Sequence, residues 1–152
     1  MSYLIIGIGN PFRRDDGVGV KVAESLAAAQ IPDCTIRVLS GEGAALMECW
    51  DGSDRVIVID AARTGSNPGK IHELDAAREK IASDFFHYSS HAFGLAEAIE
   101  MSRALNQLPE SIVVYGIEGA DFSEGMELSL AVETAAEITT ARIREYLAGA
   151  RQ

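Results

Sequence analysis

Two adjacent aspartates, Asp15 and Asp16, follow an apolar run that ends in glycine, in the stretch "LIIGIGNPFRRDDG" (residues 4–17). A glycine-rich loop after a strand is a common phosphate-binding feature. The dinucleotide pattern Gly-x-Gly-x-x-Gly would start at Gly7, but Phe12 occupies its third glycine position, and no Gly-Lys-Ser/Thr sequence follows. Because carboxylates would also occupy the place of an anion at a helix start, this loop favours a cation as its ligand.

The two aspartates cannot serve one site equally. If a helix begins near Gly17, adjacent side chains point in directions about 100° apart. One carboxylate is therefore expected to cap the helix by accepting its free N–H groups, and the other to project into a crevice. The alternative is that both only stabilise the helix start.

Asp60 ends the apolar run "VIVID" (56–60). A carboxylate at the end of so apolar a strand needs hydrogen bonds, a cation or water to offset its desolvation. Capping of the next turn is the structural alternative. Asp60 is therefore a second candidate for binding a cation.

The three histidines are His72, His87 and His91. Ser89 or Ser90 is expected to cap a helix from about 91 to 106, which places His91 in its first turn. The positive helix end disfavours protonation there, so His91 is expected to be a neutral imidazole able to bind metal. His87 is a minor candidate because the intervening serines interrupt a continuous helix, and His72 is expected at the surface.

Two carboxylates and one imidazole would make an uncharged site around a divalent ion, with positions left open for a further ligand. Ni²⁺ and Zn²⁺ both suit such ligands. The residue types do not choose between them.

The elements that must position these side chains alternate along the chain. Strands are expected at 4–9, 35–39, 55–61 and 111–117, with a weaker edge strand at 70–74; helices are expected from Gly17 and at 43–49, 91–106 and 130–147. This order predicts an α/β fold: one domain over residues 1–152, a three-layer α/β/α sandwich with a mainly parallel twisted sheet of about five strands. Ligands of such sheets bind beyond the carboxyl ends of the strands, where both aspartates, Asp60 and loop 118–128 would gather.

The bulk composition excludes other classes. The net charge of -10, from 13 basic and 23 acidic residues, argues against a nucleic-acid partner and is compatible with a cationic one. No apolar run approaches the roughly 18 residues of a membrane helix, and no signal-peptide pattern opens the chain. The two cysteines form neither a disulfide framework nor a metal-binding pair, so a cytoplasmic location without membrane contact is expected.

Four motifs in order resemble those of the hydrogenase maturation endopeptidases, the nickel-dependent proteases of NiFe-hydrogenase assembly, over nearly the whole chain. They are "GIGNPFRRDDGVG" (7–19), "VIVIDA" (56–61), "SSHAFGL" (89–95) and "VVYGIEG" (113–119). The resemblance implies an endopeptidase that removes the C-terminal extension of a NiFe-hydrogenase large-subunit precursor after nickel insertion. It also implies that Asp16, Asp60 and His91 are the metal-contacting and catalytic residues. The ion would be Ni²⁺ supplied by the substrate, with Zn²⁺ or Cd²⁺ as surrogates.

Two positions depart from the family pattern. Relatives often carry glutamate where this chain has Asp16, whose side chain is one methylene shorter. The stretch "SGEG" (40–43) stands where many members carry a Gly-Gly-Thr-like sequence, so the role of this loop stays open.

The sequence contains no His-Glu-x-x-His or Gly-x-Ser-x-Gly motif, and neither cysteine lies in a nucleophile motif. Hydrolysis by an activated water remains. Either a metal assists the attack, which we favour, or Asp16 or Asp60 acts as the general base. Loop 118–128 is expected to help select the partner.

Two rival functions are compatible with parts of the pattern. Peptidyl-tRNA hydrolases also begin with a strand and Gly-x-Gly-Asn-Pro, but their Arg-His-Asn element is replaced here by "RRDDG", and the acidic balance is wrong for tRNA. A nickel carrier or sensor with the same ligands is the non-enzymatic alternative.

Overall fold

The computed structural model describes residues 2–86 and 91–150 of the chain. The elements, in chain order, are β1 (Tyr3–Ile8), a 3-10 turn (Arg14–Gly17), α1 (Val18–Ala28), β2 (Cys34–Leu39), α2 (Gly43–Trp50), β3 (Arg55–Ala62), β4 (Ile71–Asp75), α3 (Leu95–Ala104), β5 (Ser111–Glu118) and α4 (Leu130–Ala150). All five predicted strands are present at the predicted places, within one or two residues.

The five strands form one sheet in the order β2-β1-β3-β5-β4. The first four run parallel to one another, and only β4 runs antiparallel, at the edge against β5. The predicted mainly parallel α/β architecture is therefore confirmed, including the edge position of the weak strand at 70–74.

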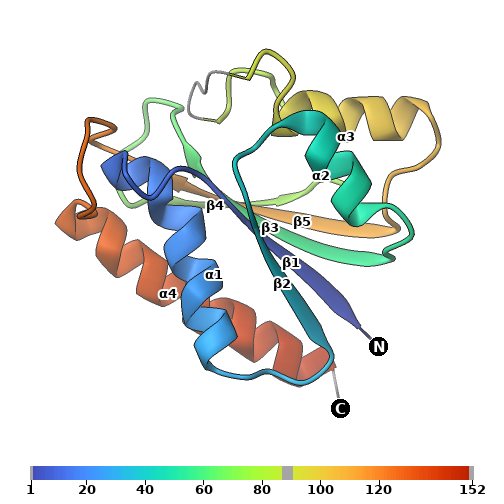
Figure 1. Cartoon of the computed structure of the whole chain (residues 1–152), viewed down its shortest axis with the longest axis horizontal. Coiled ribbons are helices and arrows are strands. Elements are labelled where there is room, and N and C mark those ends of the chain that lie inside the picture. The colour runs from blue at the N-terminus through green and yellow to red at the C-terminus, as the bar shows by residue number, and fades with distance from the viewer. Residues whose placement is uncertain (1, 87–90, 151–152) are drawn as a thin grey trace.

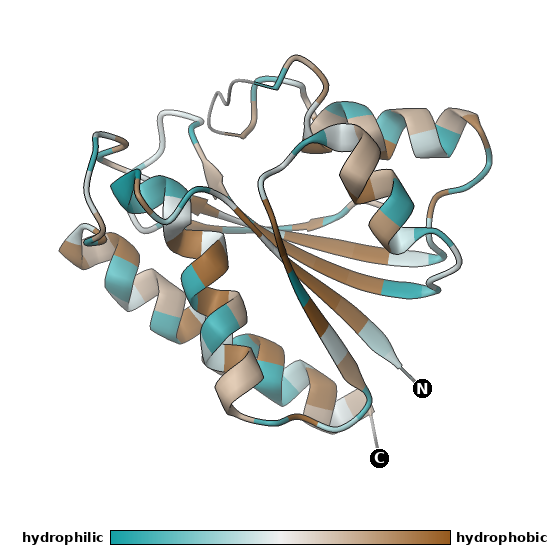
Figure 2. Ribbon diagram, viewed as in Figure 1, coloured by the Kyte–Doolittle hydropathy of each residue, from teal (hydrophilic) through white to brown (hydrophobic). Residues whose placement is uncertain are grey.

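Helices cover both faces of the sheet (Figure 1). One face packs against α1 and α4 around a core that includes Ile5, Ile57 and Ile117. The other face packs against α2 and α3 around a core that includes Ile6 and Val58. Successive residues of β1 and β3 thus enter opposite cores, which explains why these central strands are apolar throughout (Figure 2). In the described part of the chain, none of the helices has the length and apolar character needed to cross a bilayer.

The helix expected from Gly17 is present as α1, and Val18, Val22 and Leu26, four residues apart, form its fully buried face. The predicted start of the helix after residue 90 is wrong. The helix α3 begins at Leu95, because Gly94 is its N-cap and Glu97 Oε1 accepts a hydrogen bond from Gly94 N at 2.8 Å. This contact replaces the predicted serine cap with a glutamate in the first turn of the helix.

The chain order places a topological switch between β1 and β3. From β1 the chain continues through α1 to β2, which lies on one side of β1 in the sheet. On the other side of β1 lie β3, β5 and β4, in that order. Crevices at such a switch are the usual ligand sites of open parallel sheets. The loop that carries Asp16 follows β1, and Asp60 lies near the carboxyl end of β3, so both flank this crevice.

Candidate active site

One cavity of about 180 Å³ at the carboxyl edge of the sheet is lined by all three predicted site residues, Asp16, Asp60 and His91. Each comes from a different element: the turn after β1, the end of β3 and the segment before α3. The remaining lining residues are Ile8, Gly9, Ser40, Gly41, Ser83, Phe86, Ala92, Gly94, Leu95, Ala96 and Glu97.

Asp60 is the most buried of the three, with 8% of its surface exposed. Burial raises the pKa of its carboxyl well above the ordinary value; a hydrogen bond from Ala61 N at 2.8 Å opposes this, and the negative charge of Asp16 adds to it. Asp60 is therefore a carboxylate whose charge is poorly compensated by the protein and would be stabilised by a cation.

Asp16 is half-buried, and its Oδ2 accepts a hydrogen bond from Asn10 N at 2.9 Å. The backbone of Gly9 passes directly beneath the carbonyl of Asp16 with a φ of 144°, and a β-carbon at Gly9 would collide with that oxygen. Only glycine fits such a close approach in this conformation. The glycine that suggested a phosphate loop therefore serves to bring the carboxylate-bearing turn close to the end of β1.

His91 is half-buried and lies four residues before α3, not in its first turn as predicted. The predicted influence of the helix N-terminus on His91 therefore has no structural basis. The predicted caps Ser89 and Ser90, and the minor candidate His87, lie outside the described residues.

The loop at residues 40–43 supports the segment that carries His91. Ser40 and Gly41 form part of the cavity wall, and Glu42 caps α2 by accepting hydrogen bonds from Ala44 N and Ala45 N. These two hydrogen bonds and, to a lesser degree, the nearby His91 lower the pKa of Glu42. The sequence alone did not indicate this role, although the loop follows β2 at the same edge of the sheet, where ligands of parallel sheets bind.

Asp15 does not cap the helix that follows it, contrary to the prediction for one of the two aspartates. Its side chain is fully buried and accepts hydrogen bonds from Ala120 N and Asp121 N in loop 118–128 and from Ser129 N and Oγ directly after it. Neither the 3-10 turn nor α1 has a side-chain cap. The two aspartates do diverge as predicted, with only Asp16 lining the cavity.

His72 was expected at the surface, and this prediction is wrong. Its Nε2 lies 3.1 Å from Oε1 of the buried Glu118, and its ring packs edge-on against Phe85. Glu118 also accepts hydrogen bonds from Thr64 N, Thr64 Oγ1 and Gly65 N. This pair fastens the loop after β3 to the edge strand, and nothing in the local sequence indicated it.

The three predicted ligands share a cavity but are not arranged as a ready-made metal centre. Among residues 2–86 and 91–150, no three His, Cys, Asp or Glu side chains are grouped closely enough to hold a metal ion. The donor types suit a divalent ion. Their present spacing requires an approach of the side chains when a cation enters.

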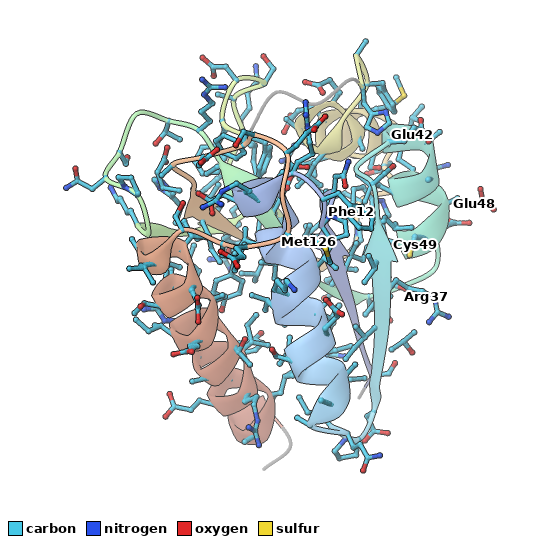
Figure 3. The ribbon with its side chains drawn as sticks, turned by 60° about the vertical axis from the view of Figure 1, so that its left-hand side comes forward. Phe12, Arg37, Glu42, Glu48, Cys49 and Met126 are labelled. Carbon is cyan, nitrogen blue, oxygen red and sulfur yellow. The ribbon has the colours of Figure 1, made fainter. Side chains whose placement is uncertain are left out.

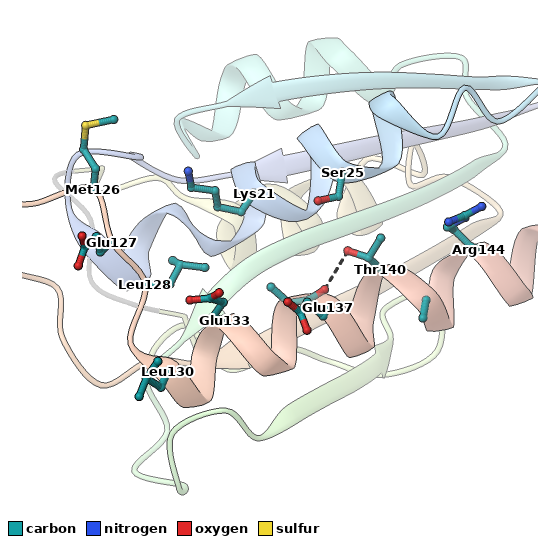
Figure 4. A pocket seen from close by; sticks show the side chains of 12 residues that line it. Lys21, Ser25, Met126, Glu127, Leu128, Leu130, Glu133, Glu137, Thr140 and Arg144 are labelled. Atoms are coloured by element: carbon teal, nitrogen blue, oxygen red, sulfur yellow. Dashed lines mark hydrogen bonds between the residues drawn. The ribbon is translucent and has the colours of Figure 1, made fainter.

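Several other hollows lie outside this cavity. A groove of about 750 Å³ between α1 and α4 is lined by residues such as Lys21, Glu133 and Thr140, whose Oγ1 donates to Ala136 O (Figure 4). A hollow of about 530 Å³ lies between the exposed side chains of Phe12 and Met126 (Figure 3). None of the three predicted site residues lines either hollow, so we place the chemistry in the smaller cavity.

The chain matches a family model described as "Hydrogenase maturation protease" over residues 20–145. This match includes Asp60 and His91 and begins just after Asp16. The hydrogenase 2 maturation protease of Escherichia coli is 26% identical over 141 residues, covering 90% of this chain and 85% of that protein. The hydrogenase expression/formation protein HupD of Bradyrhizobium diazoefficiens is 27% identical over 123 residues. That match covers 80% of this chain but 64% of HupD, so the chain spans less than two thirds of that relative's length.

Solved structures agree with the fold. The hydrogenase maturating endopeptidase HybD from E. coli superposes with a TM-score of 0.75 at 23% identity, covering 99% of this chain and 94% of that one. The hydrogenase maturation protease HycI from Thermococcus kodakarensis superposes with a TM-score of 0.71 at 27% identity, covering 96% and 92%. The family match over most of the chain shows that this protein belongs to the hydrogenase maturation protease family.

Proposed function

We propose that this protein is an endopeptidase that removes the C-terminal extension of a NiFe-hydrogenase large-subunit precursor once nickel has been inserted. The observation that carries the proposal is the single cavity lined by Asp16, Asp60 and His91, in a chain that belongs to the maturation protease family. The cavity lies at the switch point of the sheet, where a substrate can reach it.

Nickel enters this account as part of the substrate. Asp16 and Asp60 lie close enough for the charge of one to raise the pKa of the other, so an approaching cation would relieve their mutual repulsion. His91 lies on the same cavity wall and would supply a nitrogen ligand. Because the three groups are not pre-assembled, a precursor without nickel would leave the site in its open arrangement.

The reaction is peptide hydrolysis by water. The water oxygen attacks the scissile carbonyl carbon, the C–N bond breaks, and the proton released by the water passes to the leaving amine. A carboxylate of Asp16 or Asp60 not engaged by the cation can accept that proton and return it. We favour attack assisted by the substrate's nickel, with the carboxylates holding the ion beside the scissile bond.

The direct test incubates the purified protein with nickel-loaded and nickel-free precursors of candidate large subunits and measures the mass of each product. We expect loss of a C-terminal peptide from the nickel-loaded precursor alone. Asp60→Asn should slow this cleavage by at least about a hundredfold, the usual scale for removing an acid–base or ligand group.

Asp54→Asn is the matched control, because Asp54 is an exposed carboxylate at the opposite end of β3. It should cleave like the unaltered protein. Unchanged cleavage by Asp60→Asn would exclude Asp60 from both routes. Nickel binding by the protein with no change in precursor mass would instead indicate a carrier or sensor.

A further inference from the structure

Asp15 is a buried carboxylate that the proposed reaction does not use. Its Oδ2 accepts hydrogen bonds from Ala120 N at 2.8 Å, Asp121 N at 2.9 Å and Ser129 Oγ at 2.8 Å. Its Oδ1 accepts a further bond from Ser129 N at 2.8 Å. Four donors from a segment more than 100 residues away therefore converge on one side chain that is fully buried.

The same two segments are joined along their backbones. Asp15 N donates to Asp121 O, Arg14 N donates to Gly125 O, and Gly125 N donates to Phe12 O, at 2.9 to 3.0 Å. An ion pair between Arg14 Nε and Asp121 Oδ2 at 3.2 Å lies beside them. The loop that carries Asp16 is thus held from its outer side by residues 120–129.

Asp15 and Asp16 are consecutive in the short 3-10 turn Arg14–Gly17, so anchoring Asp15 fixes the backbone from which the Asp16 side chain projects. With Asp15 anchored among the amides of the far loop, Asp16 is turned toward the cavity, where its Oδ2 accepts from Asn10 N. Because Asp15 itself is fully buried and does not line the cavity, it cannot touch a substrate there.

We propose that Asp15 is a positioning residue: its carboxylate, held by the amides of residues 120–129, sets the orientation of Asp16 in the cavity. The expected effect of Asp15 on cleavage rests on the proposed function. Its expected effect on the orientation of Asp16 does not. In this proposal, loop 118–128 positions Asp16 through Asp15, in addition to its expected role in selecting the partner.

The structural test needs no substrate. In Asp15→Asn, the amide nitrogen must face at least one backbone N–H donor, so the anchor is lost with almost no change in size. We expect the backbone amide resonance of Asn10 in ¹⁵N-labelled protein to shift, together with those of Asp16 and Gly17. Resonance changes confined to residues 119–130, with the amide resonances of Asn10 and Asp16 unshifted, would overturn the proposal.

Ser129→Ala is the second variant, for use if Asp15→Asn does not fold. It removes the hydroxyl donor to Asp15 but keeps the backbone bond from Ser129 N. A smaller shift of the same resonances is expected. Resonances of Asn10 and Asp16 identical to those of the unaltered protein would count against the proposal here too.

The kinetic test compares kcat and KM per folded molecule on a nickel-loaded precursor. Displacement of a reactive group by a fraction of an ångström should lower kcat about tenfold, whereas KM should change much less. Asp54→Asn serves again as the control, and a kcat equal to that of the unaltered protein would overturn the positioning role. If the unaltered protein cleaves no precursor, the proposed function fails, and the resonance of Asn10 still decides the role of Asp15.

Discussion

Asp60 and Asp16 reach the same cavity from different elements, and the charge of Asp16 adds to the rise in the pKa of Asp60. Asp60 lies in the last part of β3, while Asp16 lies in the turn beyond β1, the adjacent strand. A carboxylate whose ionisation is opposed by burial and by a neighbouring negative charge destabilises the folded protein when it is ionised. Such an arrangement is expected where a cation is bound during function.

The first prediction concerns Asp60→Asn in the absence of metal. Asn keeps the acceptor for Ala61 N but carries no charge. The pKa of Asp60 is higher folded than unfolded, so the unaltered protein loses stability as pH rises from about 3.9 through that raised pKa. Asp60→Asn should therefore be more stable at pH 7, and the difference should disappear below about pH 4.

Thermal unfolding across this pH range measures the effect. Each unit of pKa displacement corresponds to about 1.4 kcal/mol, and 1 kcal/mol moves the Tm of a chain of this size by about 2–4 °C. The exposed Asp54→Asn should show no such gain. A Tm for Asp60→Asn below that of the unaltered protein at pH 7 would contradict the prediction.

The second prediction concerns Glu118, whose pKa is lowered whereas that of Asp60 is raised. Burial opposes the ionisation of Glu118, but hydrogen bonds from Thr64 and His72 outweigh it and lower the pKa of this carboxyl. Its contribution to stability is present above the unfolded pKa and is lost as pH falls through the folded one. Glu118→Gln should cost about 1–3 kcal/mol at pH 7, with a shrinking cost in acid. Urea unfolding at pH 7 and at an acidic pH measures this cost in the free energy of unfolding. An equal cost at the two pH values would argue against a charged Glu118.

The third prediction concerns the exposed pair Phe12 and Met126. The two residues are 61% and 60% exposed and flank one hollow (Figure 3). An isolated β-bridge between Arg13 and Gly125 joins the two segments that carry them. Exposed apolar residues that lie together commonly mark a protein-binding surface. Met126→Ser should raise KM for the precursor without lowering kcat.

Steady-state cleavage of a nickel-loaded precursor measures both constants. Leu105→Ser is the control, since Leu105 is similarly exposed but ends α3, at the other end of that helix from the cavity. A KM for Met126→Ser equal to that of the unaltered protein would remove this hollow from the partner-binding surface.

The fourth prediction concerns Gly43, which lies against the segment that carries His91. Gly43 N donates to Phe93 O at 2.7 Å, and a β-carbon at Gly43 would collide with the ring of Phe93. Gly43→Ala should displace residues 91–94 and slow cleavage while leaving Asp16 and Asp60 in place. Gly149→Ala, where a β-carbon meets nothing, is the matched control. Cleavage by Gly43→Ala at the unaltered rate would show that this contact does not position His91.

The fold could be predicted from the sequence because its signals are local. The apolar run of β3 and the spacing of Val18, Val22 and Leu26 identify elements whose burial follows directly. The gathering of Asp16 and Asp60 at one edge then follows from parallel strands alone. These parts of the site needed no knowledge of distant contacts.

Two of the errors concern contacts between distant segments, and a third concerns a local helix cap. Asp15 binds amides more than 100 residues away, and His72 pairs with Glu118 only because β4 runs antiparallel beside β5. The start of α3 was misplaced because a glutamate in its first turn, rather than a preceding serine, satisfies the backbone of Gly94. A sequence without its fold does not specify such partners.

We propose that Asp16, Asp60 and His91 hold one divalent ion. A crystal structure of the protein soaked with Zn²⁺ is the most direct test of this. Anomalous diffraction at the zinc edge locates the ion without reference to the protein atoms. We expect one site in the cavity, with a carboxylate oxygen of each aspartate and an imidazole nitrogen of His91 about 2.0–2.2 Å from the metal. An ion bound elsewhere, or by none of these three side chains, would contradict it.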